Sequence, residues 1–336
     1  MIRAFAPGRV NLIGDHTDHT GGLVLPMAID LGTTVSASVQ GDVVELRSAI
    51  EPAPAVVSIN VDDPTGITPS WARYVAGVVA ELRPDRGLVG TVATTLPVGA
   101  GLSSSAALEV AVALALGFEG TPLALAQLGQ LAEQRASGVP CGIMDQLASA
   151  AGVAGHALRI DCTTLAVTPV PLPADVEVVV VDSGQRRELA TSAYAERAGA
   201  CQAAQRELGP LRSASLTDVA GLRDATVRRR ARHVVTENAR VDELVVALAR
   251  GDRPTMAKLM AASHASLRDD FEVSTDVLDA LVERLDSTDG VIGARLTGAG
   301  FGGCVVTLVE RGAPLPTDLV LWRVRPSAGA HREAQT

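Results

Sequence analysis

The sequence predicts an α+β protein of two domains, and three observations lead to that fold class. The chain has 336 residues, more than a single core usually holds, so two domains with a ligand cleft between them are expected. Short β-rich runs and long apolar helical stretches occur in both halves. Residues 169–175 contain three prolines within five positions, which is typical of a domain crossing. We therefore predict an N-terminal domain over residues 1–168, a C-terminal domain over residues 175–326 and a disordered tail over residues 327–336.

The N-terminal half is dense in glycine and combines short strands with longer helices. Strands are expected where β-branched residues gather in short runs, and helices where apolar residues continue over longer stretches. The expected strands cover residues 33–39, 43–46, 90–95 and 157–161. The expected helices cover residues 71–82, 104–116, 122–137 and 144–150.

The C-terminal half begins with a strand that looks buried and continues mainly as helices. The expected strands cover residues 176–181, 293–297, 304–309 and 319–325. The expected helices cover residues 188–208, 227–250, 255–267 and 275–285. No internal repeat is present, so a second α+β domain is the simplest interpretation.

Composition excludes several classes of function. A net charge of -9 and eight aromatic residues argue against a nucleic-acid surface, which needs basic patches and stacking rings. No apolar run approaches the roughly 18 residues of a membrane span, and residues 1–9 lack the apolar stretch of a signal peptide. The four cysteines form no CxxC pair, so neither a zinc site nor a disulfide framework is suggested. We expect a cytoplasmic monomer with small-molecule ligands.

The basic residues are unusual because Lys258 is the only lysine among 29 of them. A Walker-type loop ends in Gly-Lys-Ser/Thr, and a protein kinase places a strand lysine on the phosphates. Any ATP chemistry in this chain must therefore use another arrangement.

A glycine- and serine-rich segment, residues 97–106, joins an expected strand to an expected helix. Its glycines allow backbone N–H groups to converge on a small anion, and Ser103, Ser104 and Ser105 stand at the helix start. The positive end of the helix dipole can then hold a di- or triphosphate without a lysine. The spacing alone fits a serine-capped helix after a flexible turn equally well. A Rossmann site is disfavoured because no Gly-x-Gly-x-x-Gly opens the first βαβ unit.

A second polar segment, residues 7–22, carries one arginine, two acids and two histidines between glycines. These are Arg9, Asp15, His16, Asp18 and His19. Short acids and imidazoles on a tight loop can donate or accept hydrogen bonds with the hydroxyls of a sugar-like ligand. A metal site is the rival hypothesis, but the two histidines are three apart on an expected turn and no other ligand cluster follows. A polar surface loop also stays open.

Two further segments could contribute chemistry. Residues 141–146 place Asp145 at a helix start, where the dipole and a cationic neighbour would keep the carboxylate ionised. Such a group can accept or align a substrate hydroxyl proton, although it could equally be an ordinary first-turn acid. Residues 296–304 form a glycine-dense turn that lets backbone approach a ligand closely, with a sharp bend as the alternative.

Together these segments resemble the GHMP kinase superfamily, and within it the galactokinase family. The superfamily signatures occur in order at residues 8–18, 97–107 and 296–304. Similarity to galactokinases in particular comes from residues 141–146, 230–237 and 263–270. The resemblance runs from residue 6 to about residue 309. It implies an N-terminal domain like the second domain of ribosomal protein S5 and a ferredoxin-like C-terminal domain.

The resemblance also implies an activity, ATP-dependent phosphorylation of the anomeric hydroxyl of galactose to give galactose 1-phosphate and ADP. Asp145 matches the catalytic aspartate of the family and Arg9 the arginine beside it, while Ser105 and Glu133 match the Mg²⁺ ligands. The ATP contacts implied are Ser48, Gly99, Ala100, Gly101, Leu102, Ser103, Ser104 and Ser105. The sugar contacts implied are Asp15, His16, Thr17, Asp18, Gly142, Asp145 and Tyr194.

One departure from the family pattern concerns specificity. Galactokinases usually have Glu-His-Thr-Asp-Tyr-Asn where this chain has Asp-His-Thr-Asp-His-Thr at residues 15–20, so the first acid is one methylene shorter and an aromatic residue is absent. That acid is expected to hold the 6-hydroxyl of the sugar. The alternatives are therefore a kinase of an arabinose-type or 6-deoxy sugar, a kinase of another small alcohol, or a non-catalytic sensor of galactose and ATP.

Overall fold

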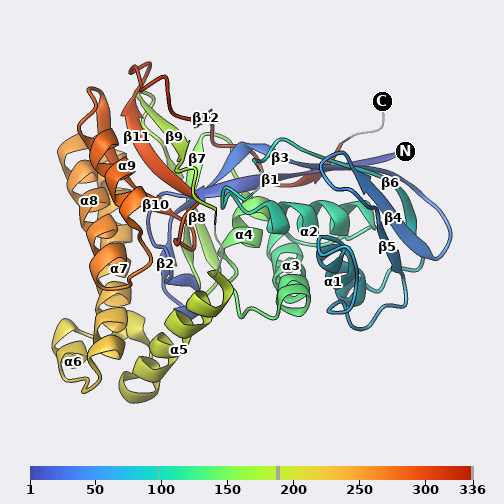
Figure 1. Ribbon diagram of the computed structural model, residues 1–336, viewed down its shortest axis with the longest axis horizontal. Coiled ribbons are helices and arrows are strands. Elements are labelled where there is room, and N and C mark those ends of the chain that lie inside the picture. The colour runs from blue at the N-terminus through green and yellow to red at the C-terminus, as the bar shows by residue number, and fades with distance from the viewer. Residues whose placement is uncertain (98, 187–189, 334–336) are drawn as a thin grey trace.

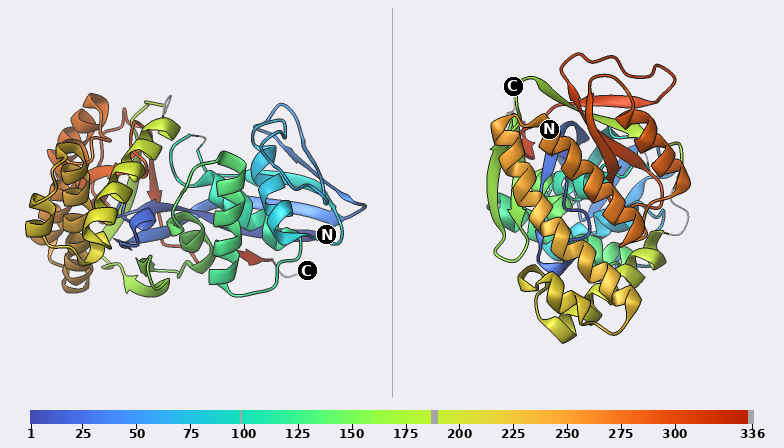
Figure 2. Two further views of the ribbon diagram at one scale, coloured as in Figure 1. Left: turned by 90° about the horizontal axis from the view of Figure 1, so that it is seen from below. Right: turned by 90° about the vertical axis from the view of Figure 1, so that its left-hand side faces the viewer.

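The computed structural model describes residues 1–97, 99–186 and 190–333, with the backbone alone at residues 190–192. The chain forms two lobes, and the N-terminus lies on the N-terminal lobe, on the side away from the C-terminal lobe (Figure 1). The helices of the C-terminal lobe gather at the opposite end of the molecule (Figure 2). Within these ranges no helix is both long enough and apolar enough to cross a membrane.

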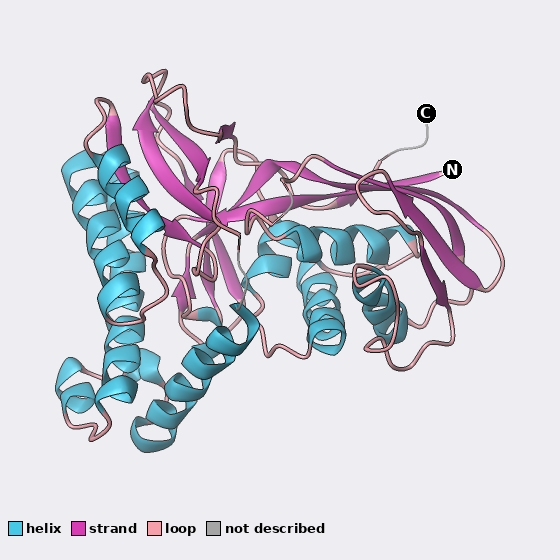
Figure 3. Ribbon diagram, viewed as in Figure 1, coloured by secondary structure: helices cyan, strands magenta, loops and turns pink. Residues whose placement is uncertain are grey.

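The N-terminal lobe consists of a six-stranded sheet covered by helices on one face (Figure 3). The strand order is β13-β1-β3-β6-β4-β5, with β4 and β6 parallel and the other pairs antiparallel. Its strands are β1 (Ile2–Asn11), β3 (Pro26–Val39), β4 (Val43–Ser48), β5 (Ala55–Ser58), β6 (Leu88–Thr94) and β13 (His331–Arg332). Its helices are α1 (Ala72–Leu82), α2 (Ser104–Ala115), α3 (Pro122–Ser137) and α4 (Met144–Ala151).

The C-terminal lobe is a four-stranded antiparallel sheet with helices packed against it. The strand order is β10-β11-β9-β12. The strands are β9 (Val176–Asp182), β10 (Val291–Thr297), β11 (Cys304–Glu310) and β12 (Leu321–Val324). The helices are α5 (Ala190–Leu208), α6 (Leu216–Ala220), α7 (Ala225–Arg250), α8 (Arg253–Asp269) and α9 (Asp276–Asp286). Single 3-10 turns lie at Asp18–Thr20 and Leu211–Ser213.

A small sheet of β2 (Leu23–Val24), β7 (His156–Asp161) and β8 (Ala166–Pro171) lies where the lobes meet. One apolar core extends across this junction, because Leu12 and Val24 share a cluster with Val180 of β9 and Leu244 of α7. The lobes are therefore packed on each other rather than joined by a free linker. A division into two domains at residues 169–175 stays a prediction.

Most predicted elements are present with shifted ends, and the prediction of a disordered tail is wrong. Residues 169–171 belong to β8, an edge strand that tolerates proline since its outer side makes no ladder bonds. The tail is ordered as far as residue 333: β13 pairs with β1, and the N–H of Glu333 donates to Arg3 O at 2.8 Å. The amino-acid pattern did not indicate this strand, because backbone hydrogen bonds rather than apolar side chains hold the segment against β1. Residues 334–336 lie outside the described ranges.

Candidate active site

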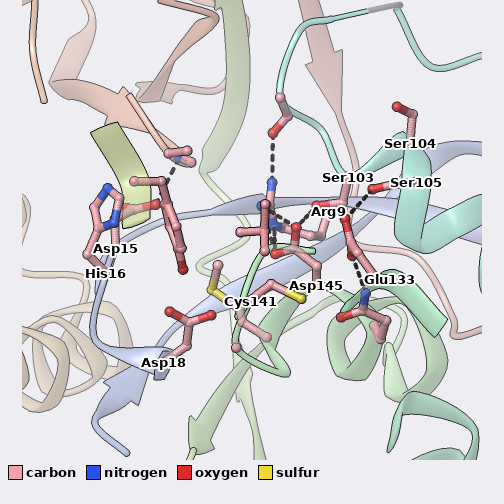
Figure 4. A pocket seen from close by; sticks show the side chains of 18 of the residues that line it. Arg9, Asp15, His16, Asp18, Ser103, Ser104, Ser105, Glu133, Cys141 and Asp145 are labelled. Carbon is pink, nitrogen blue, oxygen red and sulfur yellow. Dashed lines mark hydrogen bonds and ion pairs between the residues drawn. The ribbon is translucent and has the colours of Figure 1, made fainter. Parts of the chain in front are cut away.

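A cavity of about 440 Å³ opens where the two lobes meet, and the four segments singled out in the sequence all contribute to its wall. The β1–β2 loop (residues 12–22) supplies His16 and Asp18, and the β6–α2 loop (residues 95–103) supplies two of its glycines. Asp145 enters from α4, and Gly298 comes from the turn after β10. Segments distant in sequence therefore converge on one site (Figure 4).

Arg9 and Asp145 form an ion pair in the middle of this cavity. Arg9 Nε donates to Asp145 Oδ1 and Arg9 Nη2 to Asp145 Oδ2, both at 2.7 Å, which is a bidentate arrangement. Arg9 Nη1 donates to the carbonyl of Gly101 at 2.7 Å, and Ser103 Oγ donates to Asp145 Oδ2 at 2.6 Å. The carboxylate in the first turn of α4 is thus fixed to the β6–α2 loop by one guanidinium.

The β6–α2 loop is shaped to receive an anion. Gly99 and Gly101 have φ of 74° and 76°, values that glycine adopts without strain, and Ser103 has φ of 60°. The side chain of Ser103 does not cap α2, so the first N–H groups of that helix lack a side-chain partner. A Cβ on Gly8 would lie 2.6 Å from the carbonyl of Leu102, so glycine there lets β1 approach the loop. These features favour a phosphate group at the start of α2.

Ser105 and Glu133 lie side by side at the edge of this loop and could hold a divalent cation. Ser105 Oγ donates to Glu133 Oε1 at 2.9 Å, and burial, followed by the charge of Asp145, raises the pKa of Glu133 to about 7. Burial and the charge of Asp145 destabilise the ionised form of this carboxyl group, and a bound cation would stabilise it again. The pair therefore fits Mg²⁺. The described ranges hold no group of three or more His, Cys, Asp or Glu residues suited to a metal, so phosphate oxygens and water would complete the coordination.

The amide of Gln146 connects Glu133 to a second buried acid, Glu109. Gln146 Nε2 donates to Glu133 Oε2 at 2.5 Å and to Glu109 Oε2 at 3.0 Å. Burial and the charge of Glu133 raise the pKa of Glu109 well above its ordinary value. The amide of Gln146 therefore fixes the rotamer of Glu133 and leaves its other oxygen facing Ser105.

The β1–β2 loop presents a cluster of rings and one carboxylate. His16, at φ of 64°, packs with its ring centroid 5.6 Å from that of Tyr194. Burial lowers the pKa of His16 well below its usual range, so its imidazole is neutral. Burial opposes ionisation of both Asp18 and His19. Their contact nevertheless lowers the pKa of Asp18 and, together with the contact of His19 with Cys201, raises the pKa of His19 to about 9. The site thus offers a carboxylate, a neutral imidazole and a phenol, which suits sugar hydroxyls.

Gly142 packs directly against the carboxylate of Asp18. A Cβ at this position would lie 2.1 Å from Asp18 Oδ2, so a larger residue would displace the carboxylate. The neighbouring carbonyl of Cys141 accepts hydrogen bonds from Gln130 and Gln134 of α3, each at 3.0 Å. Two amides therefore hold the segment that carries Gly142 against Asp18.

Asp15 lies at the cavity wall, but its carboxylate is already bound. Arg295 Nη2 donates to Oδ2, and the N–H of Gly298 donates to Oδ1 at 2.8 Å. Asp15 and Arg295 are 1% and 0% exposed. The position predicted to hold the sugar 6-hydroxyl is therefore also the anchor of a buried ion pair.

Comparison with known proteins identifies the family. The galactokinase galactose-binding signature matches residues 2–39, the N-terminal GHMP kinase domain residues 73–153 and the C-terminal GHMP kinase domain residues 244–315. Human galactokinase is 45% identical over 327 residues, covering 92% of this chain and 83% of the human protein. The chain belongs to the galactokinase family. A galactokinase of Roseiflexus sp. strain RS-1 is 47% identical, covering 91% of this chain and 83% of that protein.

Solved structures agree with this family assignment. The structure of Lactococcus lactis galactokinase complexed with galactose matches with a TM-score of 0.90 and 32% identity, over 98% of this chain and 94% of that one. A mevalonate kinase matches with a TM-score of 0.69 and 20% identity, over 97% of this chain and 99% of that one, which shows the shared fold alone. The expected α+β architecture with the two GHMP kinase domains is confirmed.

Some of the predicted galactokinase residues do not line the cavity. Ser48 ends β4, Ala100 and Leu102 are buried in the apolar core, and Thr17 donates from its hydroxyl to the carbonyls of Gly14 and Leu23 at 2.9 and 2.6 Å. Thr17 therefore fixes the turn of the β1–β2 loop. The remaining predicted residues do line it: Arg9, Asp15, His16, Asp18, Gly99, Gly101, Ser103, Ser104, Ser105, Glu133, Gly142, Asp145 and Tyr194.

Sequence reasoning missed Arg186, which lines the same cavity. Its Cδ lies 3.5 Å from where a Cβ of Gly99 would stand, and its guanidinium forms an ion pair with Asp182. The residue follows β9 and belongs to the C-terminal lobe, so sequence proximity to the β6–α2 loop gave no signal. Residues 187–189 next to it, including part of the helix expected from 188, lie outside the described ranges.

Proposed function

We propose that this galactokinase-family chain transfers the γ-phosphoryl group of ATP to the anomeric hydroxyl of galactose, giving galactose 1-phosphate and ADP. The observation that supports it best is the Arg9–Asp145 ion pair, which stands between the anion-binding β6–α2 loop and the hydroxyl-binding β1–β2 loop. Phosphate donor and sugar acceptor would meet at that pair. The name and the bound galactose of the Lactococcus lactis relative point to the same sugar.

In the proposed mechanism Asp145 accepts or aligns the proton of the anomeric hydroxyl. The hydroxyl oxygen forms a bond to the γ-phosphorus while the bond to the β-phosphate oxygen breaks and ADP leaves. Arg9 orients the Asp145 carboxylate through two hydrogen bonds and lies close enough to the loop to stabilise charge on the transferred group. Ser103, which donates to Asp145, fixes the second carboxylate oxygen.

The β6–α2 loop would bind the phosphates of ATP through Gly99, Gly101, Ser103, Ser104 and Ser105. Ser105 and Glu133 would hold Mg²⁺, which neutralises phosphate charge when bound. Arg186 stands beside Gly99 and supplies a further cation for the phosphates in a site that has no lysine. Contacts from Ser48 are not part of this proposal, since it does not line the cavity.

The sugar would bind between the β1–β2 loop and α5, against His16, Asp18, Gly142 and Tyr194. Several hydroxyl partners at fixed positions favour one stereoisomer, because each unmatched polar group carries a desolvation cost. A non-catalytic sensor is disfavoured, since the ion pair and the Ser105–Glu133 pair are both in place. We also propose that the protein works in the cytoplasm as a monomer; its four cysteines form no CxxC pair in the sequence, which suits a reducing compartment.

The test is an ADP-release assay with ATP, Mg²⁺ and a panel of galactose, glucose, mannose, arabinose and 6-deoxygalactose. We expect galactose to give the highest kcat/KM, and phosphorus NMR of the product to show a phosphate coupled to the anomeric proton. Absence of galactose-dependent ADP release, or a higher kcat/KM for glucose or 6-deoxygalactose, would contradict the proposal.

A further inference from the structure

Two galactokinase-like segments, residues 230–237 and 263–270, lie outside the cavity lining and bury several polar side chains. They lie on the adjacent helices α7 and α8. His233, Glu237 and Ser263 are each 0% exposed, and none lines the cavity. Buried polar groups are costly unless each finds a partner, so their partners indicate what they hold in place.

Glu237 holds the start of the β1–β2 loop. Its Oε1 accepts from the N–H of Gly14 at 3.0 Å and from Ser263 Oγ at 2.6 Å, and its Oε2 accepts from Arg240 Nε at 2.6 Å. Burial opposes ionisation, but Arg240 and other cations lower the pKa of Glu237 to about 2. An ionised carboxylate therefore receives the backbone N–H of a loop residue at φ of 95°.

His233 holds the next residue of the same loop. Its Nε2 lies 3.0 Å from the carbonyl of Asp15, and its Nδ1 lies 2.9 Å from Ser266 Oγ. A carbonyl can only accept, so Nε2 carries the proton and donates to Asp15. Since burial lowers the pKa of His233, Nδ1 is unprotonated. The one proton of the Ser266 hydroxyl lies within reach of two acceptors, His233 Nδ1 at 2.9 Å and Asp270 Oδ2 at 3.2 Å. The carbonyl of Asp15 therefore selects the tautomer, and Ser266 contacts the other ring nitrogen.

A series of tilted ring contacts connects His233 to the cavity. Phe271, which is fully buried, has its ring centroid 4.7 Å from that of His233 and 4.6 Å from that of His16. His233 therefore reaches the sugar-facing side of the loop by two routes, through the Asp15 carbonyl and through Phe271. On the far side Arg295 binds the Asp15 carboxylate and donates to the carbonyl of Leu12 at 3.0 Å.

We propose that His233 and Glu237 are positioning residues that hold the β1–β2 loop in the conformation that presents His16 and Asp18 to the sugar. This inference rests on the proposed function of that loop. His16 has a positive φ, which a side chain rarely adopts without support, and the contacts to Gly14 and Asp15 lie directly before it. The β6–α2 loop makes none of these contacts, so loss of them should weaken sugar binding and leave ATP binding unchanged.

The experiment compares two substitutions of the same residue. His233→Gln can place an amide N–H where Nε2 stands and keep the bond to Asp15, whereas His233→Leu fills similar space and leaves that carbonyl without a donor. Thr307→Val is the matched control, because Thr307 of β11 is 0% exposed and its hydroxyl donates to Gly293 O of β10 at 3.0 Å rather than to the β1–β2 loop. For each variant, KM for galactose, KM for ATP and calorimetric affinity for galactose without ATP are measured.

We expect His233→Leu to raise KM and Kd for galactose by about tenfold, the effect of one unmade buried hydrogen bond, with KM for ATP changed less than about twofold. His233→Gln should recover most of the galactose affinity, and Thr307→Val should leave both KM values as in the wild type. If His233→Leu does not fold, Ser266→Ala, which removes the hydroxyl in contact with Nδ1, is measured in its place and should again raise KM for galactose more than KM for ATP.

Equal changes in both KM values, or no change in galactose affinity for His233→Leu or Ser266→Ala, would overturn the inference. No recovery in His233→Gln would also overturn it, because a bond to Asp15 is then not what matters. A wild-type protein inactive on galactose contradicts the proposed function instead. The two failures are therefore distinguishable.

Discussion

Glu133 gives the sharpest test of the proposed cation site, through the stability of the metal-free protein. Its pKa in the folded protein is raised from 4.5 to about 7, first by burial and then by the charge of Asp145. The folded state therefore keeps a proton that the unfolded chain releases. The stability that this provides is fully present below pH 4.5 and is lost as pH rises through about 7.

The magnitude follows from the two pKa values. The difference between 4.5 and about 7 corresponds to about 3 kcal/mol of unfolding free energy. Glu133→Gln removes the titrating group and keeps the shape of the side chain. In the presence of a chelator, the unfolding free energy of Glu133→Gln minus that of the wild type should increase by up to about 3 kcal/mol between pH 4.5 and pH 8.

The assay is urea unfolding with EDTA at a series of pH values, and it is repeated with ATP and excess Mg²⁺ in place of EDTA. We expect Mg²⁺ with ATP to stabilise the wild type above pH 7 and to have little effect on Glu133→Gln. Ser105→Ala is the control, since it keeps the carboxyl group and removes a hydrogen bond that lowers the pKa of Glu133, so the loss of stability with rising pH should persist in EDTA. A difference between Glu133→Gln and the wild type that stays constant across the pH range would refute the reasoning.

Three further predictions concern individual side chains. Asp145→Asn should lower kcat by about 10²- to 10⁴-fold while calorimetric galactose affinity is retained; near-normal ADP release would remove Asp145 from the proton transfer. Asp15→Ala should reduce the unfolding free energy by about 3 kcal/mol, because Arg295 is left buried without its carboxylate, and a change below about 1 kcal/mol in urea unfolding would contradict this. KM for galactose should rise above pH 9 as His19 loses its proton and its attraction to Asp18, whereas a flat KM from pH 8 to 10 would exclude that pair.

Sequence patterns alone located the main elements of the fold. The helix predicted over residues 122–137 is α3 with the same ends, because Thr121 caps it, proline follows at its first position and Gly138 ends it in the left-handed conformation. By contrast β1 was not predicted. It contains Pro7 and Gly8, and its register shifts between Pro7 and Arg9, so the usual alternation of a strand is interrupted.

The candidate site divides in the same way. The residue types of the β6–α2 loop, the β1–β2 loop and the start of α4 were sufficient to name Arg9, Asp18, Ser105 and Asp145, since glycine spacing and helix starts are local properties. Arg186 could not be found, because only the packing of the C-terminal lobe brings it beside Gly99.

The sequence by itself determined the glycine- and serine-rich loop, the polar loop and the chemical groups that each offers, because these depend on neighbours along the chain. Only the tertiary structure decided that Asp15 forms an ion pair with Arg295, that Gln146 donates hydrogen bonds to both Glu133 and Glu109, and that His233 contacts the carbonyl of Asp15. Each of these contacts joins residues that are far apart in the chain. Their energies come from burial, which no local pattern records.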